Sequence, residues 1–199
     1  MIKKDYRNAF LFYLLKFAGL FIIIYCVTFS IIGLSVPGGY YSSFIYHYLN
    51  YVSWLRASLL YASQWALSVF GYDSYITANV LLKLKDGYGV RIVYSCLGYG
   101  VMSFWIAFIC ANKGNLSRKF FWILGGLLLI WLINVTRICL LLLASNKHWQ
   151  TLPPFDHHTL FNIAAYLTIF ILMYFYDRSN KTRGAGDISS NPGVPLINQ

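Results

Sequence analysis

Long apolar stretches constrain this chain more than any other feature of its sequence. Three of them, at residues 9–34, 120–144 and 159–176, are long enough to cross a bilayer. A fourth, at 97–112, is shorter but strongly apolar, and it can span if its helix begins at Ser95 or if its partners are tilted. With 58% hydrophobic and only 11% charged residues, the chain is typical of a small polytopic membrane protein without a separate soluble domain.

The net charge of +10 supports an orientation in the membrane. In a soluble protein such an excess would suggest nucleic acid, but here the basic residues cluster beside apolar segments. One cluster precedes the first span, one fills the loop at 113–119, and one follows the last span: Lys3, Lys4, Arg7; Lys113, Arg118, Lys119; Arg178, Lys181, Arg183. The positive-inside rule therefore places both termini and this loop in the cytoplasm, in a multi-pass protein of the cell (inner) membrane.

This orientation constrains the stretch at 40–72, which is rich in Tyr and Trp and carries Arg56 near its centre. If the stretch crossed the membrane once, the basic loop at 113–119 would be forced outside. We therefore expect an amphipathic helix lying in the outer interface. A re-entrant hairpin, or a true span with the opposite topology downstream, is the alternative.

The segment at 75–94 has the features of a β-hairpin. Asp86-Gly87 is a turn signal, Lys83 and Lys85 alternate with leucines before it, and β-forming residues follow it. The predicted fold is thus all-α, a small transmembrane bundle of about four spans plus an interfacial or re-entrant helix, with a short extracytoplasmic β-hairpin. A membrane domain covers 1–178, and 179–199 is expected to be a disordered cytoplasmic tail.

Among the four cysteines, only Cys96 lies at the boundary between a polar stretch and an apolar segment. The other three, Cys26, Cys110 and Cys139, lie inside apolar runs, where a structural role is expected. The chain has no CxxC pair, so neither a disulfide framework nor a metal cluster is indicated. The stretch VYSCLGYGVMSFWIAF, residues 93–108, delivers the Cys96 thiol to the outer end of its membrane segment.

An asparagine and an arginine lie within the apolar segment at 120–144. Asn134 and Arg137 are three residues apart and share one face of a helix. An arginine at such a position costs about 2.5–3.5 kcal/mol on insertion scales. About seven apolar residues follow Arg137, so the reach of its side chain to water is marginal. We therefore interpret Arg137 as functional, in the outer half of the membrane.

Two histidines open the last apolar segment. His157 and His158 follow Asp156, and either Asp156 or Thr159 can cap the helix. His158 shares a face with Asn162 four residues later. Adjacent positions on a helix point about 100° apart, so the pair is poorly arranged to chelate one metal. A lone histidine at a boundary is more often interfacial than functional, and its meaning depends on what lies at the same depth.

The outer half of the membrane is the depth at which we expect Cys96, Arg137 and the histidine pair to lie together. In a small bundle, the three helices that carry them can place a thiol, a guanidinium and an imidazole around one site. A free thiol is mostly protonated at neutral pH, so a cysteine nucleophile needs a nearby cation or general base. Arginine stays charged and can stabilise a developing oxyanion.

These residues resemble the exosortase/archaeosortase family of membrane-embedded transpeptidases. The family pattern has a cysteine followed by small residues, an Asn-x-x-Arg within a transmembrane helix, and a histidine opening a later helix. Here these are Cys96-Leu97-Gly98, Asn134-Val135-Thr136-Arg137 and Asp156-His157-His158, over about 75–176. Cys-Leu-Gly replaces the commoner Cys-Ser-Gly, and the chain is shorter than typical members, which fits a compact branch of the family.

The resemblance implies a sortase-like reaction on secreted proteins that end in a short motif, an apolar helix and a basic end. Cys96 would form an acyl-thioester, His158 would be the general base and acid, and Arg137 would stabilise the thiolate or oxyanion. His157 is the alternative histidine and Asn134 a supporting residue. A glycan or lipid acceptor on the cell surface would resolve the thioester, with no metal, other cofactor or nucleic acid.

Two other classes of function compete with this hypothesis. A non-enzymatic assembly factor for secretion or polysaccharide machinery would explain the aromatic stretch at 40–72 and the basic loops equally well. It gives no reason for Arg137 within the bilayer. A small transporter subunit with Arg137 as an anion site is disfavoured, because the chain has few spans and no internal repeat.

Overall fold

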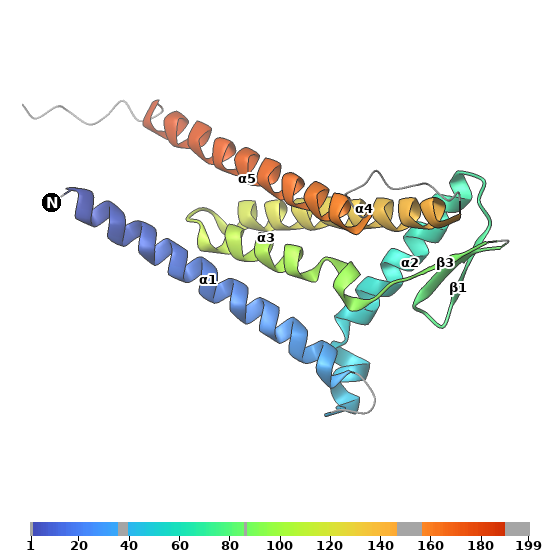
Figure 1. Ribbon diagram of the computed structural model, residues 1–199. Coiled ribbons are helices and arrows are strands. Elements are labelled where there is room, and N and C mark those ends of the chain that lie inside the picture. The colour runs from blue at the N-terminus through green and yellow to red at the C-terminus, as the bar shows by residue number, and fades with distance from the viewer. Residues whose placement is uncertain (1, 36–39, 86, 147–156, 190–199) are drawn as a thin grey trace, which may run out of the picture.

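The computed structural model describes residues 2–35, 40–85, 87–146 and 157–189. Side chains are described within these ranges except those of residues 2–6, 95, 157–162 and 180–189. Four long or apolar helices dominate the chain (Figure 1), namely α1 (Ile2–Leu34), α3 (Tyr99–Ala111), α4 (Leu116–Asn146) and α5 (His157–Ser189). They correspond to the four predicted apolar segments.

Two helical stretches, Arg7–Leu34 and Leu116–Asn146, are long and apolar enough to cross a membrane by length and composition. Both were expected as spans. The chain is therefore mostly helical with two candidate spans in the described residues, while the total of about four spans stays a prediction. The apolar helix α3 has 13 residues, about 20 Å of helix.

Aromatic side chains hold α1 and α5 against α3 and α4. From α1, Phe17 packs edge-on against Phe104, with ring centroids 5.1 Å apart. From α5, the buried Tyr176 packs against Phe108 of α3 and Trp122 of α4, at 5.8 and 5.4 Å. Figure 1 shows α3 lying between α1 and α5, so α3 and α4 form the centre of the bundle.

The stretch predicted as interfacial forms a π-helix, η1 (Ile45–Leu49), followed by α2 (Tyr51–Val69). α2 runs at a steep angle to α3 and α4 in Figure 1. One of its faces is buried and includes Leu59 and Leu60, whereas Trp54 and Trp65 on the other are exposed. α2 is not among the described helices that pass the test for a membrane span. This two-sided helix has the form expected of an interfacial one, and its place in the membrane stays a prediction.

A three-stranded antiparallel sheet follows α2, with the order β1 (Ser74–Thr77), β2 (Leu81–Leu84) and β3 (Gly89–Arg91). β2 and β3 form the predicted hairpin, with Leu82 paired to Val90. Asp86 of its turn lies outside the described residues, and the side of the membrane on which the sheet lies stays a prediction.

The third strand, β1, was not expected from the sequence. The connection from β1 to β2 contains Ala78 and Asn79 with φ of 52° and 54°, and no glycine marks this turn in the sequence.

The C-terminal helix is longer than expected. α5 runs past residue 179 to Ser189, and the expected disorder of the tail stays a prediction. Residues 190–199 lie outside the described residues, and the boundary between membrane domain and tail stays a prediction.

Candidate functional site

The chain enters α3 through a tight turn that carries Cys96. Val93 is extended, residues Tyr94–Leu97 form the 3₁₀ helix η2, and Gly98 caps α3 in the left-handed region at φ 72°. The amide of Cys96 donates to the carbonyl of Val93 at 2.9 Å. Leu97 is fully buried and anchors the turn in the core, which leaves the Cys96 side chain half-buried next to the start of α3.

Asn134 of α4 holds this turn from the side. Its Nδ2 donates to the carbonyl of Leu97 at 3.1 Å. A Cβ atom on Gly98 would lie 2.5 Å from the same Nδ2. Position 98 therefore favours glycine for two reasons, its positive φ and the close approach of Asn134. The amide contact places Asn134 as a positioning residue for the cysteine turn.

Arg137 lies beside the thiol. Its side chain is only 7% exposed, and its Nη2 is 3.8 Å from the Sγ of Cys96. Its Nε is buried without a hydrogen-bond partner. A guanidinium interacts more strongly with an anion than with a neutral group, so Arg137 is placed to stabilise negative charge that develops beside the Cys96 sulfur.

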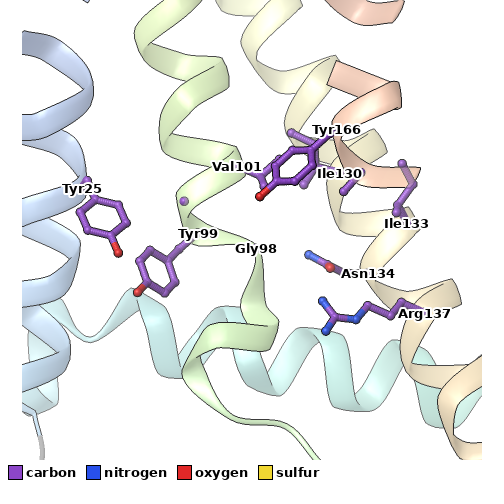
Figure 2. A pocket seen from close by; sticks show the side chains of 11 residues that line it. Tyr25, Gly98, Tyr99, Val101, Ile130, Ile133, Asn134, Arg137 and Tyr166 are labelled. Carbon is purple, nitrogen blue, oxygen red and sulfur yellow. The ribbon is translucent and has the colours of Figure 1, made fainter. Parts of the chain in front are cut away.

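A cavity of about 290 Å³ opens where α1, α3, α4 and α5 meet. Figure 2 shows Asn134 and Arg137 extending from α4 toward the chain at Gly98, while Tyr25 and Tyr99 face each other. None of the lining residues is acidic: they are Tyr25, Gly98, Tyr99, Gly100, Val101, Ile130, Ile133, Asn134, Arg137, Ala165 and Tyr166. Cys96 is not among them, although it contacts Arg137 in the cavity wall.

A second cavity of about 550 Å³ adjoins the first and is almost entirely apolar. The two share Gly100, Val101 and Tyr166 in their walls. The second is completed by residues of α1, α3 and α5: Phe21, Phe104, Ile169 and Phe170. A ligand that occupied both would place a polar group near Arg137 and an apolar group between α1 and α5.

The two candidate histidines open α5, as the sequence predicted for a helix there. Asp156 lies outside the described residues, and the side chains of His157 and His158 are not described. Further along the same helix, Ala165 and Tyr166 line the first cavity. α5 therefore leads from the histidine pair to the cavity wall.

The structure thus brings three predicted site residues together, namely Cys96, Asn134 and Arg137. It also shows a contact that sequence reasoning missed. The guanidinium of Arg56 in α2 lies over the ring of Tyr94 at 5.0 Å, two residues before Cys96. A charged residue in the middle of an aromatic helix was a visible signal, but its partner could not be identified without the fold.

The other three cysteines lie apart from this site. All four are free thiols, and Cys110 and Cys139 are half-buried whereas Cys26 is exposed. Within the described ranges, no three His, Cys, Asp or Glu side chains lie close enough to hold a metal ion.

Comparison with known families connects this geometry to a family. A family profile described as Transmembrane exosortase (Exosortase_EpsH) matches residues 9–175. The chain belongs to the transmembrane exosortase family. The match covers α2, α3 and α4, parts of α1 and α5, the sheet and the cysteine turn, so the resemblance seen in three short motifs extends over most of the chain. No curated protein and no solved structure matches it.

Membership in this family, with the two apolar helices, makes the chain a membrane protein of exosortase type.

Proposed function

We propose that this exosortase is a cysteine transpeptidase that cleaves C-terminal sorting signals of secreted proteins and transfers them to a cell-surface acceptor. The observation that carries this proposal is the 3.8 Å contact between the buried Arg137 guanidinium and the Cys96 sulfur. Burying a charged side chain in an apolar bundle costs free energy, so the presence of one indicates a function. The non-enzymatic alternative gives the buried, unpartnered Nε of Arg137 no such function.

In this proposal Cys96 attacks the carbonyl carbon of the scissile peptide bond as a thiolate. The new S–C bond forms while the carbonyl electron pair moves to oxygen. Collapse of this intermediate breaks the C–N bond, and the general acid protonates the leaving amine. The resulting thioester is attacked by an acceptor nucleophile, which releases Cys96 again.

His158 is the better candidate for the general base and acid. It precedes Ala165 of the cavity wall by seven residues, two turns of helix, which brings the two positions to within about 20° of each other around the helix axis. His157 is about 80° away from Ala165 by the same periodicity. The helix phase therefore favours His158 over His157.

The two cavities suit a substrate with a polar scissile segment followed by an apolar helix. The first cavity offers Arg137 and Asn134 to the peptide bond, and the apolar second cavity offers room for the first side chains of the helix. The acceptor would be a glycan or lipid group on the outer side of the cell membrane. No metal or organic cofactor is required by this chemistry.

Capture of the thioester tests the proposal. The chain is co-expressed with a tagged secreted protein of its source organism that ends in an apolar helix and basic residues. We expect an adduct on Cys96 that is labile to hydroxylamine and absent from the Cys96→Ala variant. Cleavage of the substrate without such an adduct, and unaffected by Cys96→Ala, would rule out thiol catalysis.

Topology is a separate part of the proposal, because it decides where the acceptor must be. Single cysteines at 86 and at 115, in a background without other cysteines, can be labelled from outside with an impermeant maleimide. We expect labelling at 86 and protection at 115. Labelling at 115 from outside would place the site on the cytoplasmic side and would exclude a surface acceptor.

A further inference from the structure

The first turn of α3 forms part of the wall of the first cavity, through Tyr99, Gly100 and Val101. The first amides of any α-helix have no acceptor within the helix. In α3 the first helical bond runs from the amide of Met102 to the carbonyl of Gly98 at 3.0 Å. The amides of residues 99–101 therefore have no acceptor within this 13-residue helix and lie at its positive end.

A second observation points to a ligand in the same place. Arg137 is more than nine-tenths buried, lines this cavity and has an unpartnered Nε. Figure 2 shows its guanidinium directed toward the chain at Gly98. The first-turn residues of α3 and the Arg137 guanidinium border one cavity whose described lining has no acidic residue, so this space can be occupied by a negative charge.

We propose that the amides of Tyr99, Gly100 and Val101, together with Arg137, form the oxyanion hole of this enzyme. The inference rests on the proposed function and adds backbone groups to it. When the Cys96 sulfur bonds to the scissile carbon, the carbonyl oxygen becomes an alkoxide. Donors fixed in advance around that oxygen stabilise this state without reorganisation.

The amides serve the oxyanion rather than the thiolate. Cys96 lies two residues before the cap residue Gly98, and it is not part of the cavity wall that the amides line. The thiol already has one cationic contact, the Nη2 of Arg137. Interactions made only in the transition state change the rate of acylation and leave substrate binding unchanged.

Position 100 allows one amide to be removed with a matched control. A Cβ atom on Gly100 would meet only Tyr25 Cε2 at 3.7 Å, an ordinary contact, so Gly100→Ala keeps both the fold and the N–H. Gly100→Pro removes the N–H at a first-turn position where proline is tolerated. Thioester formation is measured at saturating amounts of the tagged secreted protein, and alkylation of Cys96 by a maleimide is measured in parallel.

We expect Gly100→Pro to form the thioester about 10²-fold more slowly than Gly100→Ala, with Cys96 alkylation and substrate affinity unchanged. Leu116→Pro in the first turn of α4, compared with Leu116→Ala, should leave both rates unchanged. Equal acylation by the two Gly100 variants would overturn the assignment. So would an equal loss of alkylation and acylation, because the amides would then act on the thiol or on folding. Failure of the wild-type chain to form any thioester would overturn the proposed function, and the oxyanion hole with it.

Discussion

Helices α3 and α4 approach each other closely at two places, and the two are built alike. At one, Gly126 of α4 receives the ring of Trp105, whose Nε1 donates to the carbonyl of Trp122 at 3.1 Å. At the other, Gly98 receives the amide of Asn134, whose Nδ2 donates to the carbonyl of Leu97 at 3.1 Å. Each contact pairs a glycine with a side-chain N–H that satisfies a main-chain carbonyl.

The two contacts differ in what surrounds them. The Gly126 contact is enclosed by an apolar cluster that includes Ile109, Ile130 and Tyr176. The Gly98 contact has beside it a cavity and the buried guanidinium of Arg137, one of whose nitrogens has no partner. Close packing alone therefore does not mark a candidate site in this bundle. The candidate site is marked by a buried guanidinium with an unpartnered nitrogen next to a cavity.

The largest difference between the two contacts is expected when the cysteine nearest to each is replaced by alanine and substrate processing is measured. Cys96 lies beside the Gly98 contact, and Cys110 lies toward the other end of α3. We expect Cys96→Ala to abolish substrate processing, because no other group can form the acyl-enzyme. Cys110→Ala, like Cys26→Ala and Cys139→Ala, should change processing by less than about twofold. Processing is measured as cleaved substrate per amount of enzyme in the membrane, and normal cleavage by Cys96→Ala would remove the distinction.

Arginine substitutions should give the next largest effect. Arg137→Leu is expected to insert but to be inactive, and Arg137→Lys to process at least about tenfold more slowly, because lysine lacks the planar fork. Arg118 at the opposite end of α4 donates to Ser179 Oγ, and Arg118→Lys should be nearly neutral. The same cleavage assay serves, and full activity of Arg137→Leu would exclude the arginine from the mechanism.

Alanine substitutions of Gly98 and Gly126 should have different effects, one on the rate of substrate processing and the other on the stability of the fold. Gly98→Ala would place an alanine at a positive φ and its Cβ against Asn134. We expect the protein to be present in normal amounts but to process its substrate about tenfold more slowly, less than the loss of a whole oxyanion donor. Gly126→Ala overlaps the Trp105 ring and should lower the free energy of unfolding by about 1–3 kcal/mol. Its rate per folded molecule should not change. Thermal unfolding in detergent and cleavage per folded molecule distinguish the two, and identical behaviour of both variants would contradict the comparison.

The smallest effect is expected from Arg56, which reaches the cysteine turn only through Tyr94. A cation–π contact is worth about 0.5–2 kcal/mol, so Arg56→Gln should slow Cys96 alkylation and processing by roughly threefold. Tyr94→Phe keeps the ring and should be neutral, whereas Tyr94→Leu should match Arg56→Gln. Arg91→Gln, on an exposed strand position, is the matched control. An equal loss from Arg91→Gln would indicate a general effect of charge.

The sequence predicted the four apolar helices well because each lies in a predominantly apolar run, and the bilayer permits little else there. It also predicted that Cys96 and Arg137 meet, since the alternation of basic clusters puts both at one depth. The hairpin of β2 and β3 was visible in its turn residues. The strand β1 was not, because an Ala-Asn turn carries no strong signal.

Three features of the site depended on the fold. The left-handed conformation of Gly98 follows from the turn that precedes α3. The hydrogen bond from Asn134 to Leu97 depends on how α3 and α4 pack. The stacking of Arg56 on Tyr94 depends on the position of α2. The last two of these join residues that are 37 and 38 positions apart. Local patterns carry no information on these partners.

The shortness of α3 has a consequence for the fate of the thioester. Its 13 residues cover about 20 Å, whereas the hydrocarbon core is about 30 Å thick. In the proposed orientation the basic loop after α3 fixes the other end at the cytoplasmic surface, so the cysteine turn is sunk below the outer surface. Water is scarce at that depth, so an acyl group formed there by the proposed mechanism would be protected from hydrolysis. The proposed membrane-borne acceptor, dissolved in the same layer, would meet the thioester at high local concentration, and the shortness of this helix would then favour transfer over release.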